Sequence, residues 1–135
     1  MSAEQVLVIR PGALGDTLML LPLLAALENV LDPVVAGRRP GSDGLRFRCI
    51  RCADVEVGGW HVLFEETPVP RPPAAADLRP GHVLAFLNDP GGTVARNLDA
   101  LFPDAATRVF PGRPPEQEPL HAALHLARCA ARTGL

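Results

Sequence analysis

Short apolar runs alternate with turn-rich stretches along the chain, and these runs predict its strands. Residues 6–9 form an uninterrupted apolar run rich in β-branched side chains, which is typical of a strand that is buried on both faces of a parallel sheet. We expect this run to be the first and central strand. Residues 33–36, 82–87 and 107–110 predict further strands, the second of these being the clearest.

Helical periodicity follows the first run and recurs twice later. From Asp16 onward, apolar residues recur three and four positions apart, which predicts a helix with a wide buried face. Two stripes form this face: Leu18, Leu21 and Ala25 in one, and Leu20, Leu24, Leu27 and Leu31 in the other. Pro22 predicts a kink, or a short first turn and a restart. Residues 93–102 predict a second helix, and residues 120–132 a closing helix with apolar Leu120, Leu124 and Leu126.

The remaining segments have weaker patterns. Alternation of apolar and basic residues over 45–52 predicts a half-exposed strand, and residues 53–59 and 60–64 predict further short strands. Residues 68–80 and 111–119 are rich in proline and predict extended connections.

Strands that alternate with helices predict right-handed β-α-β units and one parallel sheet. The chain of 135 residues is 47% hydrophobic and 21% charged, and a chain of this length can bury roughly 70% of its unfolded surface in one core. We therefore expect a single α/β domain over residues 1–135, with a Rossmann-like parallel sheet and flanking helices.

Charge and hydropathy exclude several classes of function. The net charge of −2 argues against a protein whose whole face holds a nucleic acid, because such a face needs a large positive excess. The longest uncharged apolar run, residues 17–27, has 11 residues and contains Pro22, whereas a membrane-spanning helix needs about 20. The start of the chain has no cationic leader, so we expect a cytoplasmic protein.

The turn after the first predicted strand is the first place to look for chemistry, because ligands of open α/β sheets bind beyond the carboxyl ends of the strands. Gly12 and Gly15 permit a tight turn and the close approach of a ligand to the backbone. The segment lacks both the G-x-G-x-x-G pattern of dinucleotide sites and the G-K-[ST] of a P-loop. Both common phosphate-binding motifs are therefore excluded here.

This segment resembles a known family. A strand, a short loop ending in Leu14-Gly15-Asp16, and a Leu-rich helix with Pro22 six residues after Asp16 resemble the amino terminus of the heptosyltransferases. These are the glycosyltransferases of family 9, which use ADP-heptose to build the inner core of lipopolysaccharide. The proline-rich segment before His121 and the closing helix are similar to the end of that family's amino-terminal domain, whereas residues 37–110 agree in pattern only.

The resemblance implies a GT-B architecture, in which two Rossmann-like domains face a cleft. The amino-terminal domain holds the acceptor and the carboxy-terminal domain holds the nucleotide sugar. This chain corresponds to the amino-terminal half, so a nucleotide-sugar donor is expected to bind a carboxy-terminal domain or partner chain, with no cofactor or metal in this half. The expected acceptor is a saccharide or lipid-linked core, which implies possible peripheral association with the inner face of the inner membrane, and the isolated half is expected to be inactive.

The resemblance also implies roles for single residues. Asp16 matches the family's catalytic base, which deprotonates the acceptor hydroxyl so that it attacks the anomeric carbon with inversion. A helix start favours the carboxylate and makes it a weaker base, and the alternative role is that Asp16 only caps the helix. The family has small hydroxyl residues where this chain has Pro11, Gly12 and Ala13, which removes side-chain donors and leaves the acceptor's identity open.

Two further polar positions are candidates for the cleft. Arg10 ends the first predicted strand and is the arginine expected closest to the substrate. Asp89 to Gly92 follow a strand and precede a helix, where backbone amides can meet an anion. We expect Asp89 and Gly91 in the cleft wall, although Pro-Gly-Gly is equally typical of a plain turn.

Basic residues and possible metal ligands complete the candidates. Arg38, Arg39, Arg46, Arg48 and Arg51 can pair with phosphates or sugar acids, or form an ordinary solvated face. Cys49 and Cys52 have C-x-x-C spacing, and His121 and His125 are one helical turn apart, but neither pair comes with the remaining ligands of a zinc site. We therefore expect no metal, and we expect buried, apolar roles for the cysteines, including Cys129.

Two rival functions stay open at this point. One is a non-catalytic module that keeps the fold and binds a ligand or partner. The other is an unrelated Rossmann-like nucleotide binder, which would bind nucleotide as an isolated chain. If the chain is half of a GT-B enzyme, the face toward the other half should carry exposed apolar surface.

Overall fold

The computed structural model describes residues 4–11, 19–29, 31–38, 45, 51–56, 59–66, 77–111 and 122–132. Its elements, in chain order, are β1 (Gln5–Arg10), α2 (Leu21–Leu27), β2 (Asp32–Gly37), β3 (Arg51–Asp54), the 3₁₀ helix η2 (Trp60–Phe64), β4 (Pro80–Phe86), α4 (Thr93–Leu101), β5 (Ala106–Phe110) and α5 (Ala122–Ala131). The strands predicted at 6–9, 33–36, 82–87 and 107–110 and the helices predicted at 93–102 and 120–132 are confirmed, with shifted ends.

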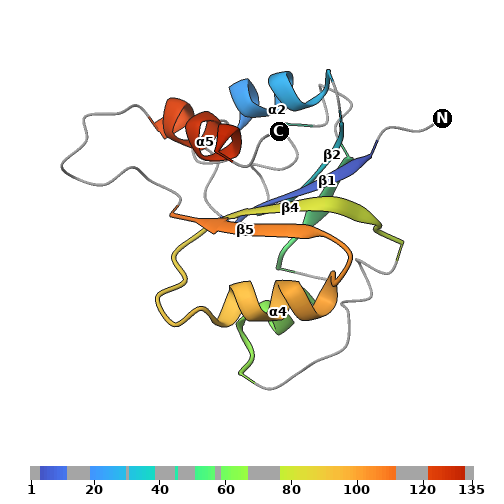
Figure 1. Ribbon diagram of the computed structural model, residues 1–135, viewed down its shortest axis with the longest axis vertical. Coiled ribbons are helices and arrows are strands. Elements are labelled where there is room, and N and C mark those ends of the chain that lie inside the picture. Colours follow the sequence, from blue (N-terminus) through green and yellow to red (C-terminus); the bar gives the residue numbers. More distant parts are fainter. Residues whose placement is uncertain are drawn as a thin grey trace.

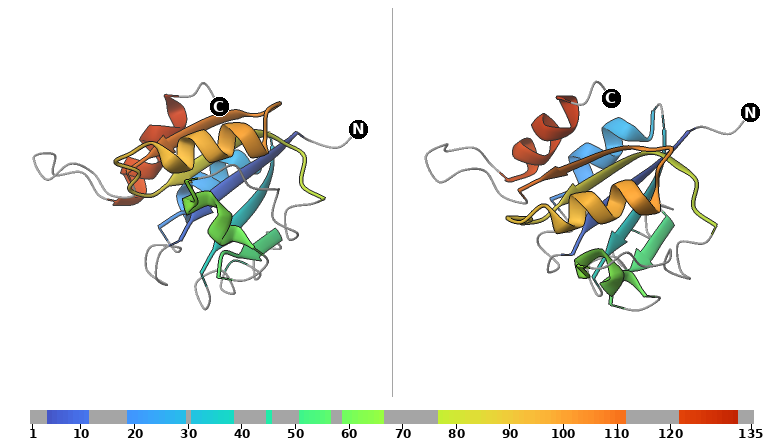
Figure 2. Two further views of the ribbon diagram at one scale, coloured as in Figure 1. Left: turned by 90° about the horizontal axis from the view of Figure 1, so that it is seen from below. Right: turned by 60° about the horizontal axis from the view of Figure 1, so that its bottom comes forward.

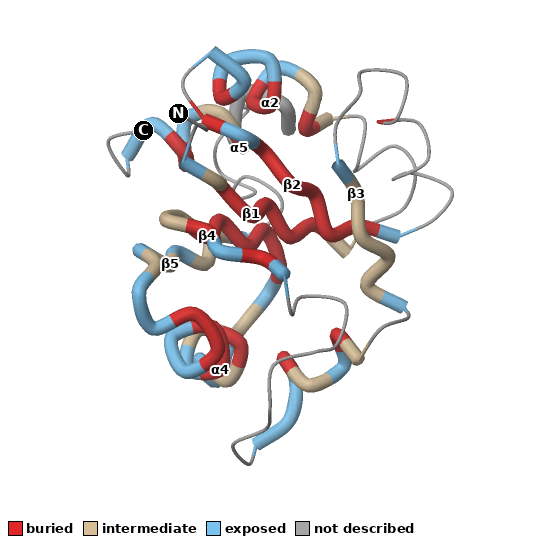
Figure 3. The backbone as a smooth tube through the Cα atoms, turned by 90° about the vertical axis from the view of Figure 1, so that its right-hand side faces the viewer, coloured by how far each residue is buried: buried red, intermediate tan, exposed pale blue. Residues whose placement is uncertain are grey.

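The five strands form one parallel sheet in the order β3-β2-β1-β4-β5. β1 is central and pairs with β2 on one side and β4 on the other, so that Leu7 lies between Val34 and Val83. Residues 6–9 are at most 1% exposed, and burial falls off toward the edge strands β3 and β5 (Figure 3). The α/β, Rossmann-like parallel sheet is therefore confirmed.

Helices cover both faces of the sheet. α2 and α5 lie together on one face, and α4 lies on the other with η2 beside it (Figures 1 and 2). Alternating side chains of β1 supply both cores, because successive strand residues point to opposite faces. Val6 and Val8 pack on the α2 side, and Leu7 and Ile9 on the α4 side. This alternation explains why an uninterrupted apolar run marks the middle of the sheet.

The first helix begins later than the periodicity suggests. α2 starts at Leu21 and has Pro22 in its first turn, where the missing N–H would have no helical partner in any case. Pro22 thus lies in the first turn of α2, whereas the short turn predicted before it falls on residues 16–18, outside the described residues, so the restart stays a prediction. The stripe of Leu20, Leu24, Leu27 and Leu31 is buried. The other stripe is not a buried face, because Leu21 is half-buried and Ala25 is exposed.

The strand predicted at 45–52 is wrong in its placement. Leu45 is buried in the core on the α2 side and belongs to no strand, while residues 46–50 lie outside the described residues. The observed strand, β3, begins at Arg51. It ends after Asp54, whose carboxylate accepts the Glu56 N–H at 3.0 Å, a local bond that favours a turn. A strand continuing from residue 53 to 59 is therefore also wrong.

The strand predicted at 60–64 is a 3₁₀ helix. Trp60 and Leu63 are both buried, at 1% and 2% exposure. In a strand they would point to opposite faces, whereas three residues per 3₁₀ turn place both on one side. Tertiary packing against the α4 side of the sheet selects the conformation that buries both. Most of the proline-rich connections, at 67–76 and 112–120, lie outside the described residues.

One buried amide joins η2 to α4. Asn97 on α4 is 4% exposed, and its Nδ2 donates to the carbonyl oxygens of Val62, Leu63 and Glu65 at 3.3, 2.8 and 2.7 Å. Carbonyl groups at the end of a short helix lack helical partners, and a buried carbonyl without a donor is costly. The Val62 carbonyl also accepts the Glu65 N–H at 3.2 Å, so the Leu63 carbonyl is the buried group that depends on Asn97, and this bond holds η2 beside α4.

We expect Asn97→Ala to lower the free energy of unfolding by about 1–3 kcal/mol, because it leaves the buried Leu63 carbonyl group unsatisfied. Chemical denaturation followed by circular dichroism measures this change. Asn29→Ala is the matched control, since Asn29 is exposed and makes one long bond of 3.5 Å to the Ala25 carbonyl. The control should change stability by less than about 0.5 kcal/mol. Equal effects of the two substitutions would contradict this role of Asn97.

Candidate functional site

The strand order creates a crevice at one edge of the sheet. From β1 the chain moves outward to β2 and β3, and then returns past β1 to β4 and β5. The following helices α2 and α4 therefore lie on opposite faces (Figure 1). In open α/β sheets this reversal leaves a crevice outside the carboxyl ends of the two central strands. Here those strands are β1 and β4.

Arg10 lies at the carboxyl end of β1, as the sequence predicted, while its contact with a substrate stays a prediction. It ends β1 and is 9% exposed. Its Nη1 donates to the Phe86 carbonyl at the end of β4, at 3.2 Å. This bond links the two strands at the reversal and fixes a guanidinium group there. A buried cation has a stronger field than an exposed one, because less water screens it.

The predicted base and both glycines of the first turn lie outside the described residues. Asp16, Gly12 and Gly15 belong to residues 12–18, which connect Pro11 after β1 to Met19 before α2. The N-cap of α2 is Leu20, which makes no side-chain capping bond. The capping role considered for Asp16 therefore does not apply to α2.

The loop between β4 and α4 places Asp89 at the helix start. Its Oδ1 and Oδ2 accept the backbone N–H groups of Val94 and Ala95 at 3.1 and 3.0 Å. The anion at this helix start is thus the chain's own Asp89 carboxylate, and the N–H groups of Val94 and Ala95 are occupied by it. Gly92 has a φ of 72°, which glycine adopts without strain, and Gly91 lies exposed in the same turn.

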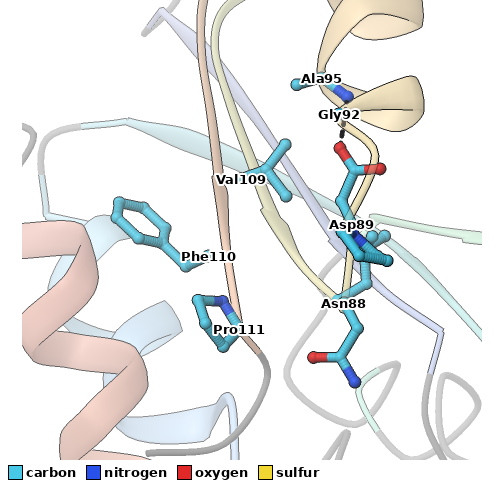
Figure 4. Close-up of a pocket in the computed structure, with 9 residues that line it drawn as sticks. Asn88, Asp89, Gly92, Ala95, Val109, Phe110 and Pro111 are labelled. Atoms are coloured by element: carbon cyan, nitrogen blue, oxygen red, sulfur yellow. Dashed lines mark hydrogen bonds between the residues drawn. The ribbon is translucent and has the colours of Figure 1, made fainter. Parts of the chain in front are cut away.

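A groove opens between this loop and the end of β5. It has a volume of about 640 Å³, and Figure 4 shows Asn88 and Asp89 across from Val109 and Pro111. Its lining residues are Leu87, Asn88, Asp89, Pro90, Gly92, Ala95, Val109, Phe110 and Pro111. The volume lies within the roughly 300–1,000 Å³ of small-molecule sites, so the groove is a candidate binding site at the carboxyl edge.

Asp89, Pro90 and Gly92, from the segment that the sequence predicted for the cleft wall, line this groove, whereas Gly91 is not among its described lining residues. Asn88, Ala95 and the end of β5 were not predicted. Asn88 and Pro111 carried a usable signal, because each directly follows the end of an apolar strand. Parallel strands end at the same edge of a sheet, so these positions were candidates for one site. That β4 and β5 are neighbours became known only from the strand order.

The arginines of residues 38–51 that the structure describes pair with acids at the surface. Arg38 Nε lies 2.9 Å from Glu56 Oε1, and Arg51 forms a hydrogen-bonded ion pair with Asp77. The Arg51 guanidinium holds the pKa of the Asp77 carboxyl below its usual value. All four side chains are about half exposed or more, which favours a solvated face over a ligand site for Arg38 and Arg51. Arg39, Arg46 and Arg48 lie outside the described residues.

Neither Cys52 nor Cys129 forms a disulfide with a residue that the structure describes. Cys129 is 3% exposed, and burial raises the pKa of its thiol, in line with the expected apolar role. Cys52 is half-buried. Within the described ranges, no three His, Cys, Asp or Glu side chains are arranged to hold a metal ion. Cys49, His121 and the side chain of His125 lie outside what is described.

A scan against protein-family models, a search of curated proteins and a search of solved structures each find no match to this chain. None of the helices in the described ranges has the length and apolarity needed to cross a bilayer.

We expect Asp89→Ala to lower the free energy of unfolding by about 1 kcal/mol, because α4 loses the acceptor of two orphan N–H groups. Thermal and urea denaturation measure the change. Asp104→Ala, which removes an exposed carboxylate in the turn before β5, is the control and should change stability by less than about 0.5 kcal/mol. An unchanged stability of Asp89→Ala would show that the capping contributes nothing.

In the folded protein at pH 8, we expect iodoacetamide to label Cys129 at least about tenfold more slowly than Cys52, because the Cys129 thiol is buried and its pKa is raised. Peptide mass spectrometry reads each site separately. In 8 M urea the two rates should become similar. Equal labelling of the native protein would contradict the burial of Cys129.

Proposed function

We propose that this chain is the acceptor-binding, amino-terminal domain of an inverting GT-B glycosyltransferase similar to the heptosyltransferases. The observation that carries the proposal is the strand order, in which β1 ends beside β4 at the reversal. Residues 12–18, the core of the resemblance, follow β1 in the sequence and lie outside the described residues. Ligands of such sheets bind beyond the carboxyl ends of the central strands, and β1, which ends at Arg10, precedes this segment.

In this proposal Asp16 is the general base. Its carboxylate takes the proton from an acceptor hydroxyl, the hydroxyl oxygen forms a bond to the anomeric carbon, and the bond from that carbon to the nucleoside diphosphate breaks. The diphosphate leaves with the bonding electron pair, and the configuration is inverted. The role of Asp16 comes from the resemblance alone.

Arg10 supplies the positive charge of this acceptor site. Its guanidinium is held at the crevice by the Phe86 carbonyl, so it is ordered before the acceptor arrives. A phosphate or sugar carboxylate on the acceptor pairs well with a guanidinium in such a position. For a lipid-linked acceptor, the protein would act as a peripheral protein at the inner face of the inner membrane.

The donor is proposed to bind a second domain or a partner chain. A nucleoside diphosphate commonly uses the free N–H groups at the start of a helix. At α4 the N–H groups of Val94 and Ala95 are bonded to Asp89, whose charge repels a diphosphate. This arrangement disfavours α4 as a nucleotide site and supports the acceptor role over the rival of an isolated nucleotide binder.

We expect Asp16→Asn to slow sugar transfer by roughly 100-fold or more, since an amide cannot accept the proton and general base catalysis contributes about 10²–10⁴-fold. The assay supplies the chain with its expected donor-binding domain, in the same polypeptide or as a separate chain. It measures nucleoside diphosphate release from a panel of nucleotide sugars. Asp32→Asn is the matched control, because Asp32 is exposed at the amino end of β2, and it should leave the rate unchanged.

Two outcomes would overturn this function. Transfer that is insensitive to Asp16→Asn would remove Asp16 as the base. If no donor is turned over while the chain still binds saccharide saturably, the chain is the non-catalytic binding module instead.

A further inference from the structure

The groove between the β4–α4 loop and the end of β5 is lined by the side-chain amide of Asn88. Asn88 is exposed and lines the groove, and no residue that the structure describes forms a hydrogen bond with its side chain. An Asn amide offers two N–H donors and one carbonyl acceptor. It can therefore give and take hydrogen bonds from the same ligand.

Next to it, Asp89 offers acceptors in a fixed position. Each of its carboxylate oxygens accepts one backbone N–H, at 3.1 and 3.0 Å, and a carboxylate has about four lone-pair sites in total. Acceptor capacity thus remains on both oxygens. Because the two bonds hold the carboxylate in place, little conformational entropy is lost when it binds a ligand hydroxyl.

The charge of the groove selects against anions. Among the described residues that line it there is one carboxylate and no arginine, lysine or histidine. The positive end of α4, which would attract a phosphate, already faces the Asp89 carboxylate (Figure 4). A phosphorylated or carboxylated ligand would meet the Asp89 carboxylate, and none of the described lining residues supplies a compensating cation.

The rest of the lining is apolar. Val109, Pro111 and Ala95 present hydrocarbon surface across from and beside the polar pair. A sugar ring has the matching chemistry, since its hydroxyls need donors and acceptors while its C–H faces favour apolar surface. A volume of about 640 Å³ is ample for such a ring.

We propose that this groove binds an uncharged saccharide ring, with Asp89 accepting from its hydroxyls and Asn88 both donating and accepting. The proposal rests on the proposed function, because it gives the acceptor a neutral sugar subsite. Arg10, on the neighbouring strand β1, serves the acidic part of the acceptor in the crevice. The carboxyl edge of the sheet would then bind two parts of one acceptor.

The test titrates the ¹⁵N-labelled chain with methyl α-glucoside, methyl α-mannoside, methyl β-galactoside and maltotriose as uncharged probes. Glucose 6-phosphate and glucosamine are the charged probes. We expect at least one uncharged probe to shift the amides of Asn88, Asp89, Ala95 and Val109 saturably. Glucose 6-phosphate should bind about tenfold more weakly than the best uncharged probe, because of the Asp89 charge.

Two variants test the groove itself. Ala95→Leu fills it from α4 and should abolish the shifts, while Ala100→Leu, an exposed position on the same helix, should leave them unchanged. Asn88→Ala should weaken binding by about fivefold to tenfold through lost hydrogen bonds, and Asn29→Ala should not. Thermal denaturation of each variant checks that the fold is kept.

Several results would overturn the proposal. These are no saturable shift with any uncharged probe, binding that survives Ala95→Leu, and binding of glucosamine alone, which would make the groove a cation site. Failure of the proposed function is distinguishable. If the groove binds saccharide but transfer does not depend on Asp16, the catalytic role fails alone. If transfer depends on Asp16 but no probe shifts the amides of the groove, only the proposed sugar subsite is wrong.

Discussion

The burial of β1 on both faces is the constraint on which the rest of the structure depends. Residues 6–9 are at most 1% exposed, so the sheet needs a strand on each side of β1 and a helical layer on each face. Alternate side chains of β1 thereby belong to two cores. Val6 and Val8 pack on the side of α2 and α5, and Leu7 and Ile9 pack on the side of α4 and η2. Placing β2 and β4 on opposite sides of β1 forces the chain to reverse, and the reversal generates the crevice.

At the carboxyl edge, two charged residues are held by backbone groups in different ways. The Arg10 guanidinium donates to the Phe86 carbonyl, which leaves a fixed cation at the crevice. The Asp89 carboxylate accepts from the first turn of α4, which removes that helix start as an anion site. The edge is therefore electrostatically uneven, positive at β1 and acidic beside β4. The acceptor that we propose, with an acidic part and a neutral sugar part, would be complementary to this arrangement, whereas a diphosphate would meet the Asp89 carboxylate on the α4 side.

Some parts of the fold depend on tertiary packing and not on the local sequence. Asn97 shows the tertiary side, because its amide serves carbonyl groups of η2 more than thirty residues earlier and no local pattern indicates that pairing. Trp60 and Leu63 show the same dependence. Their spacing fits several conformations, and only the surface they pack against selects the 3₁₀ helix. The alternation around Leu45 predicts a strand, yet Leu45 is buried in the core on the α2 side and belongs to no strand. A single apolar residue can be buried without belonging to a strand.

The sequence by itself determined the parallel α/β class, the central strand and the positions of Arg10 and Asp89 after apolar runs, because these depend on hydrophobic periodicity and on local turn chemistry. Pro22 predicted an interruption of the helical pattern, and the structure places it in the first turn of α2. Only the tertiary structure decided that β4 and β5 are neighbours, that their ends enclose a groove, and that Asp89 occupies the start of α4. Those features join residues far apart along the chain, and their energies come from packing and from bonds that exist only after the strands have assembled.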